Sequence, residues 1–324
     1  MKFLASFFLA AILSAPAWGA TPALPGTLNY VEGQASIGDE SLSAKSVGST
    51  SLQPGQVIST QTGKAEILLT PGVFFRIGDD SVATLVSPNL TNTEVALSKG
   101  QAMVEVAEIH NDNLLRVQEN GATTQLLKVG VYGFDANRGD VRVFSGEAMV
   151  QDGDRQIKVK GGHQLNVSNP DNLKTAKFDK SQYEASDLYR FSNLRSEYLA
   201  EANTDAARTY YPGAAGWYGA GWYWDPFFTA YTWIPGDGIF YSPFGWGFYS
   251  PFWIGYAPYY GRYPYGYVGG HPRPYLAGHP GVYGHPGYVG RPSNGFHGSP
   301  SAPAAHSFGV MGGGFHGGGG GFHR

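Results

Sequence analysis

Apolar and polar side chains alternate with a period of two through much of the first half of the chain. Ala65, Ile67 and Leu69 share one side of such a segment, and Val141 and Val143 share one side of another. Successive side chains of a β-strand point to opposite faces of its sheet, so this alternation predicts strands that each bury one face. The pattern therefore predicts a β-rich domain.

Turn motifs separate these predicted strands at short intervals. They pair glycine with proline or a small polar residue, as at Pro54–Gly55, Pro71–Gly72, Asn120–Gly121 and Asp152–Gly153. This spacing predicts an all-β fold over residues 27–168, either a β-sandwich or a short β-solenoid. A segment of this length is long enough to bury a hydrophobic core.

Residues 179–206 follow a different period. Phe191, Leu194, Tyr198 and Ala202 recur at spacings of three and four residues, which places them on one stripe of an α-helix. We therefore expect a single helix here, which either packs on the β-rich domain or leads away from it.

The composition changes near residue 209, after which glycine, proline and aromatic residues dominate and charges are few. Residues 209–268 form an aromatic segment in which proline and glycine interrupt every apolar run, so no transmembrane helix is predicted there. Residues 269–324 are rich in glycine, histidine and proline and poor in branched aliphatic side chains. Such a segment buries too little apolar surface to offset the entropy of ordering, and we expect it to be largely disordered.

Residues 1–20 have the pattern of a cleavable signal peptide. Lys2 precedes an apolar run over residues 3–13, and the small residues Ala17 and Gly19 follow. The run is shorter than the roughly 20 residues that a membrane-spanning helix needs. We therefore expect export to the periplasm or the extracellular space, with no transmembrane helix in the mature chain. An uncleaved anchor is the alternative.

The chain contains no cysteine and has a formal net charge of −3. The lack of cysteine excludes disulfides, thiolate metal sites and the acylated cysteine of a bacterial lipoprotein, and it suits a bacterial periplasm. No basic region is strong enough to predict binding to nucleic acid.

Three phrases within residues 27–168 combine a glycine turn with an alternating strand. They read Leu52-x-x-Gly55-x-x-Ile58-x-Thr60-x-x-Gly63-x-Ala65-x-Ile67-x-Leu69, Leu97-x-x-Gly100-x-x-x-Val104-x-Val106 and Val141-x-Val143-x-x-Gly146-x-Ala148-x-Val150. In order and spacing they resemble the FecR-type domain of exported and envelope bacterial proteins. The segment from Gly130 to Phe134 lacks the Gly-Thr pair that many members carry, and with the aromatic tail it resembles a side branch of that family.

The resemblance implies a non-enzymatic β-module with no catalytic residues to transfer. Founding members of the family sense iron–siderophore uptake and signal through a membrane helix to a sigma factor. Because a signal peptide is predicted here where those members have a cytoplasmic segment and a membrane helix, we expect the shared β-module without the sigma-factor role.

Histidines are concentrated in the last part of the chain, where seven of the nine lie at or after His271. Neutral imidazole binds zinc, copper and nickel, so His271, His279 and His285 are candidate metal ligands. Their separations match no compact ligand motif. The alternative is a low-complexity tail in which these side chains bind nothing specific.

Six tryptophans of the aromatic segment form a candidate interaction surface: Trp217, Trp222, Trp224, Trp233, Trp246 and Trp253. Aromatic rings combine apolar area with a polar edge and are suited to stack on sugars or on other aromatic chains. An equal alternative is that these rings pack in local turns or against the β-rich domain. Too few basic residues lie among them to predict stacking on nucleic acid.

Together these patterns favour a non-enzymatic exported protein that binds or scaffolds an envelope protein or polysaccharide. One alternative is a periplasmic sensor or regulatory subunit that works with a separate membrane protein. Another is an enzyme that acts on cell-wall glycans. No cofactor is expected, because the sequence contains no hydrolase, zinc-protease or phosphate-binding motif.

Overall fold

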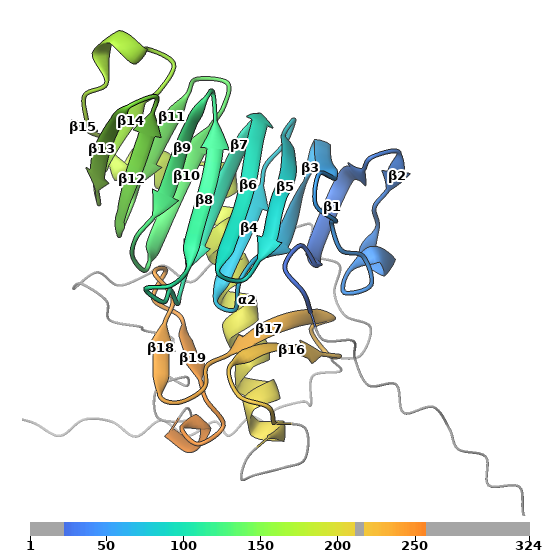
Figure 1. The fold of residues 1–324 in the computed structure, drawn as a ribbon. Helices are drawn as coiled ribbons and strands as arrows, with labels where there is room; N and C mark the ends of the chain where they lie inside the picture. The colour runs from blue at the N-terminus through green and yellow to red at the C-terminus, as the bar shows by residue number, and fades with distance from the viewer. Residues whose placement is uncertain (1–22, 211–216, 257–324) are drawn as a thin grey trace, which may run out of the picture. The chain divides into compact units, whose positions relative to one another are not determined.

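The structure, a computed structural model, describes residues 23–210 and 217–256 (Figure 1). Strands dominate these residues, and one long helix accompanies them, so the predicted all-β class with one helix is confirmed. The predicted signal peptide over residues 1–20 and the predicted disordered tail over residues 269–324 lie outside the described residues.

Fifteen strands of the described part of the chain form one continuous sheet. They are β1 (Leu28–Ile37), β2 (Glu40–Ser41), β3 (Val57–Leu68), β4 (Val73–Ile77), β5 (Val82–Asn89), β6 (Asn92–Lys99), β7 (Gln101–Val106), β8 (Leu114–Glu119), β9 (Ala122–Leu126), β10 (Gly130–Asp135), β11 (Asp140–Val143), β12 (Glu147–Asp152), β13 (Arg155–Lys160), β14 (His163–Asn166) and β15 (Ala176–Lys177).

Helices and two hairpins follow the sheet in the chain. The helices are α1 (Lys180–Glu184) and α2 (Asp187–Thr209), and the hairpins are β16 (Gly221–Asp225) with β17 (Ala230–Ile234) and β18 (Ile239–Tyr241) with β19 (Gly247–Tyr249). Short 3-10 turns occur at Ala44–Ser46, Pro170–Asn172 and Ile254–Tyr256. No helix within 23–210 or 217–256 is long and apolar enough to cross a membrane.

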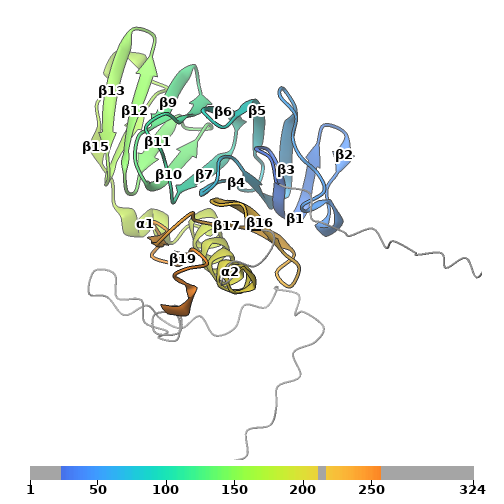
Figure 2. The ribbon, with the colours of Figure 1, turned by 60° about the horizontal axis from the view of Figure 1, so that its bottom comes forward.

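Strand β3 joins two facing layers of the sheet. Its beginning pairs with β5, and its end pairs with β4. From β5 the hydrogen-bonded order continues through β6, β8, β9, β12 and β13, which we call the front layer. From β4 it continues through β7, β10, β11, β14 and β15, which we call the back layer. The two layers face each other as a β-sandwich (Figure 2).

The bend in β3 depends on a pair of glycines. Gly63 lies opposite Gly33 of β1, and the register of the two strands shifts directly after this pair. A Cβ atom on Gly33 would lie 2.1 Å from the carbonyl oxygen of Thr62, and one on Gly63 would lie 2.4 Å from that of Glu32. Only residues without a side chain allow the two backbones to approach this closely.

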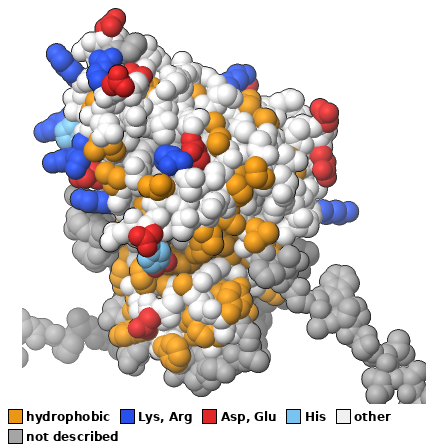
Figure 3. Space-filling view, in the orientation of Figure 1, with side chains coloured by type: hydrophobic (Ala, Val, Ile, Leu, Met, Phe, Trp, Pro, Cys, Tyr) orange, Lys and Arg blue, Asp and Glu red, His pale blue; other side chains and the backbone are white. Residues whose placement is uncertain are grey.

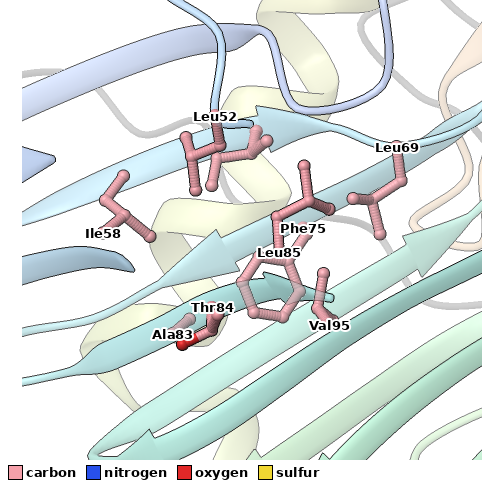
Figure 4. Close-up of a pocket in the computed structure, with 9 residues that line it drawn as sticks. Leu52, Ile58, Leu69, Phe75, Ala83, Thr84, Leu85 and Val95 are labelled. Carbon is pink, nitrogen blue, oxygen red and sulfur yellow. The ribbon is translucent and has the colours of Figure 1, made fainter. Parts of the chain in front are cut away.

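Apolar side chains from both layers fill the space between them. The largest fully buried ones include Phe75, Tyr132 and Phe134. Near β3 and β5 the packing leaves a space of about 10 Å³, with Leu52 and Val95 among the side chains that line it (Figure 4). That volume is about the size of one water molecule, so this region offers no room for a small-molecule ligand.

The two layers differ in how their outer faces are buried. Strands β8, β9 and β12 of the front layer alternate between buried and accessible residues, as a half-exposed sheet requires. Every residue of β4 and β10 in the back layer is buried. Figure 2 shows the reason, because α1, α2 and the hairpins lie across the outer face of the back layer.

Helix α2 presents a mixed polar and apolar face to the back layer. Ser186 caps its first turn by accepting a hydrogen bond from the backbone N–H of Tyr189. Its buried positions include Phe191 and Leu199, but also Ser192 and Arg195. The stripe of apolar residues predicted from the sequence therefore coincides only in part with the buried face of α2.

A buried ionic network ties α2 to the back layer. Glu66 of β3 accepts hydrogen bonds from Arg76 Nε at 2.6 Å and from Arg195 Nη2 at 2.9 Å. Arg76 of β4 also donates to Glu105 of β7 at 2.7 Å. The residues are between 0% and 8% exposed. Three strands and the helix thus share one set of charge-assisted hydrogen bonds.

Neutral polar groups extend this network to the hairpins. The Ser196 hydroxyl bonds to a carboxylate oxygen of Glu105 at 2.6 Å and to the Ser242 hydroxyl at 3.0 Å. The Asn29 amide donates to Glu66 at 2.9 Å and exchanges two hydrogen bonds with the backbone of Tyr231. The β16–β17 hairpin is therefore anchored directly to β1.

The charges of the network determine the pKa of Glu66. Burial alone would raise this pKa, but the guanidinium groups of Arg195 and Arg76 outweigh burial and lower the pKa to about 2. Glu105 has one arginine partner in place of two, and burial raises its pKa. Arg76 holds both carboxylates, so it is the member whose loss leaves most charge uncompensated.

We predict that Arg76→Met destabilises the chain by about 3–5 kcal/mol, because it leaves Glu66 and Glu105 buried without their shared cation. Urea unfolding measures the change. Lys99→Met is the matched control, since Lys99 pairs with Asp80 at an exposed site and its loss should cost less than about 1 kcal/mol. Arg195→Met serves as a second network variant should Arg76→Met fail to fold. Losses below about 1 kcal/mol for the network variants would contradict this account.

Candidate binding face

The outer face of the front layer is the broad sheet surface that the described residues leave open. Along β8 and β12, Val117 and Val150 point into the core, while Arg116 and Gln151 point outward. In Figure 3 this face carries mostly polar side chains and backbone, and hydrophobic side chains gather instead over the region of the hairpins. The polar side chains of such a face can form hydrogen bonds with a ligand.

Strand register sets the outward side chains in two cross-strand rows. The first row is Arg116, Gln125, Met149 and Lys158, and the second is Gln118, Thr123, Gln151 and Gln156. Neighbouring strands lie about 4.8 Å apart, so each row is a ladder of side chains at that spacing. Residues far apart in the chain are brought together only by this pairing.

A shallow hollow of about 220 Å³ lies over these rows. Six residues of the rows and Leu127 line it, with Met149 and Leu127 as its apolar members. No hydrogen bond among the described residues uses the side-chain amides of Gln125 or Gln156. The hollow therefore offers amide donors and acceptors to a ligand.

Neighbouring acidic groups balance the positive charges of the first row. Arg116 donates to Glu94 at 2.5 Å and to the amide oxygen of Asn92 at 2.6 Å. Gln118 also donates to Glu94. Arg116 is therefore held in place and has its charge matched within the sheet.

The other end of the first row is balanced in the same way. Lys158 lies 3.0 Å and Lys128 lies 3.5 Å from carboxylate oxygens of Glu147. The hydrogen bond from Lys158 lowers the pKa of Glu147 from its ordinary value. Glu147 is thus paired with both lysines, and this border of the hollow carries one carboxylate for two cations.

Comparison with protein families shows which family the strands of this sheet resemble. Residues 56–154 match the family model described as FecR protein. The chain contains a FecR domain. The match covers both layers from the start of β3 to the turn before β13, so it includes most of the hollow.

Comparisons with solved structures and with curated proteins assign no further family to the chain. Two crystal structures of a proposed anti-sigma factor from Parabacteroides distasonis each match 43% of this chain, with 16% identity and a TM-score of 0.33. The chain covers 64% of the length of those proteins. No curated protein matches the chain.

The structure divides the six predicted surface tryptophans by burial. Trp222 and Trp233 are 4% and 0% exposed and pack with Phe74 of the FecR domain in one apolar cluster. They are not surface residues, because the hairpins fold onto the back layer. For these two, the alternative of packing against the β-rich domain is the one observed.

The remaining four predicted surface tryptophans keep some accessible area. Trp217, Trp224 and Trp246 are half-buried, and Trp253 is 41% exposed. Trp217 stacks on Tyr223 with a ring-centroid distance of 5.4 Å. These rings are spread over the hairpin region and form no single patch with the hollow of the FecR domain.

The candidate metal ligands His271, His279 and His285 lie outside the described residues, so their metal binding stays a prediction. Within residues 23–210 and 217–256, no group of three or more histidine or acidic side chains is arranged to hold a metal ion.

One buried acidic residue of the FecR domain has no compensating partner. Glu119 at the end of β8 is 2% exposed, and neither carboxylate oxygen has a hydrogen-bond partner among the described residues. Burial, reinforced by Asp135 and Asp140, raises the pKa of Glu119 to about 8, although Arg142 opposes the shift. The sequence showed only a polar residue before the Asn120–Gly121 turn and so gave no sign of this burial.

We predict that Glu119 makes the FecR domain less stable as the pH rises. Its folded pKa of about 8 exceeds the ordinary value, so the folded state holds a proton that the unfolded state releases above about pH 4.5. The free energy of unfolding should fall by about 4 kcal/mol relative to Glu119→Gln between pH 5 and pH 9.

Urea unfolding at both pH values measures this difference. Glu40→Gln, at an exposed position on β2, is the matched control and should follow the wild type. A wild-type pH dependence that Glu119→Gln reproduces would show that Glu119 does not carry the effect.

Proposed function

We propose that this chain is a non-enzymatic exported protein that binds a component of the bacterial envelope through the outer face of the front layer. The observation that carries the proposal is the asymmetry of the sandwich. The chain's own helix and hairpins bury the outer face of the back layer, whereas the front layer keeps an outer face with a hollow.

The burial of three acidic groups of the FecR domain supports a non-enzymatic role. Glu66 and Glu105 are held in ion pairs inside the fold, and Glu119 is buried against the core. A general acid or base must reach the reacting group of a substrate, and these three carboxyl groups are closed off from solvent. The hollow itself is lined by amides, a hydroxyl, an arginine and apolar groups.

A regulatory role with a separate membrane protein is the second candidate, and the FecR match favours it. In that case the same open face would contact the membrane partner, since the back layer is already occupied by α2. Both candidates place the protein outside the cytoplasm, in the periplasm or beyond it, in keeping with the predicted signal peptide.

Sedimentation with isolated bacterial envelopes tests the proposal. We expect the wild-type protein to pellet with washed envelopes, and the double variant Gln125→Arg, Gln151→Arg to bind at least tenfold more weakly. Two bulky cations block the hollow, yet both side chains point to solvent, so stability should change by less than about 0.5 kcal/mol. The double variant Gln34→Arg, Gln182→Arg places the same charges at exposed positions on β1 and α1.

Equal sedimentation of the two double variants and the wild type would contradict binding through the front layer. Release of soluble fragments from the envelopes by the wild-type protein would contradict the non-enzymatic part of the proposal.

A further inference from the structure

We infer that the hollow on the front layer binds an uncharged saccharide. This inference rests on the proposed function, because it names the ligand class of the same face. It follows from the chemistry of the lining, the pairing of the nearby charges, the saturation of the local backbone and the size of the hollow.

The lining matches a polyhydroxyl ligand. A carboxamide offers both an N–H donor and a carbonyl acceptor, as a sugar hydroxyl also does, so each amide can serve a pair of neighbouring hydroxyls. Gln125, Gln151 and Gln156 supply three amides, of which that of Gln151 also donates to the carbonyl oxygen of Gly153 at 3.3 Å, and Thr123 adds a hydroxyl. Met149 and Leu127 provide apolar atoms against which the C–H face of a pyranose ring can pack.

The electrostatics of the hollow select against charged ligands. A phosphate or carboxylate needs an available cation, but Arg116, the one charged residue among the described side chains that line the hollow, is matched by Glu94, and Lys158 beside the hollow is paired with Glu147. A cationic ligand needs an available carboxylate, and both of these carboxylates are already paired. Binding an ion here would break an existing pair, whereas a neutral ligand would leave both pairs intact.

The backbone around the hollow argues against an extended peptide. Peptides that add to a sheet bond to the free edge of a strand. Strands β8, β9 and β12 are each paired on both sides, with β6 and β9, β8 and β12, and β9 and β13. The hollow lies over the side chains of these three paired strands and meets the unpaired edge of the sheet only at Gln156 of β13, so side-chain groups supply most of its recognition. Its two apolar residues are too few to form a groove for an amphipathic helix.

The volume of the hollow sets the size of the bound part. About 220 Å³ is below the range of about 300–1,000 Å³ that encloses a drug-sized ligand. One or two sugar rings therefore occupy the hollow, and the rest of a longer chain continues over the open sheet. Along that direction each row offers further polar side chains, one per strand, at a spacing of about 4.8 Å.

Isothermal titration of the full chain with neutral oligosaccharides tests the inference. The probes are cellohexaose, maltohexaose, N-acetylchitohexaose and the neutral polysaccharide fraction of bacterial envelopes, and hexagalacturonate is the anionic comparison. We expect at least one neutral probe to bind more tightly than hexagalacturonate. The double variant Gln125→Ala, Gln151→Ala should weaken that binding at least tenfold, and Gln34→Ala on β1 should leave it unchanged.

Three results would overturn the inference: no binding of any neutral probe, stronger binding of hexagalacturonate, or unchanged binding by the double alanine variant. Protease treatment of the envelopes separates this failure from failure of the proposed function. If sedimentation is blocked by the arginine substitutions but is also abolished by protease, the front layer binds an envelope protein and only the saccharide inference fails. If the arginine substitutions have no effect, the proposed function fails as well.

Discussion

The ionic network of Glu66, Arg76, Glu105 and Arg195 decides which surface of the FecR domain is available. Removing these charges from water costs several kcal/mol for each ion, and only short, well-directed hydrogen bonds offset that cost. Two of these bonds, at 2.6 and 2.7 Å, lie within the sheet, and the 2.9 Å bond from Arg195 to Glu66 exists only while α2 lies on the back layer in one position. The network therefore favours a single arrangement of helix and sheet, and a displaced helix would leave charges buried without partners.

The hairpins depend on that same arrangement. Asn203 of α2 donates to the backbone of Trp233 and Tyr249 and accepts from Tyr249, so both hairpins follow the helix. Trp222, Trp233 and Phe248 then fill the space above Phe74. Once this cluster has formed, the outer face of the back layer is interior, and the front layer keeps the accessible face among the described residues.

Sequence patterns predicted strands of both layers, such as β11 with Val141 and Val143 in the back layer, but they did not show which strands are buried on both faces. Alternation is visible where one face meets water, as in β8 and β12, but β4 is buried on both sides and Arg76 within it is a member of the ionic network. On α2 the predicted stripe included Leu194 and Tyr198, which are half-buried. Polar Ser192, Arg195 and Ser196 are buried beside Phe191 and Ala202 of the stripe, because the helix meets charged groups of the sheet. The hairpins escaped prediction since their glycine and proline turns separate strands of only three to five residues.

The hollow was beyond sequence reasoning because it depends on register. Gln125 and Gln151 are ordinary polar positions in isolation, and a shift of one residue in the pairing of β9 with β12 would turn one set of side chains to the core. Inward-facing Leu126 and Val150 prevent that shift through core packing. The core thus determines the position of each amide on the outer face, while no amide of the hollow is needed for the stability of the core. Stability rests on the interior and on the back layer, so the front layer can carry a polar recognition surface without weakening the fold.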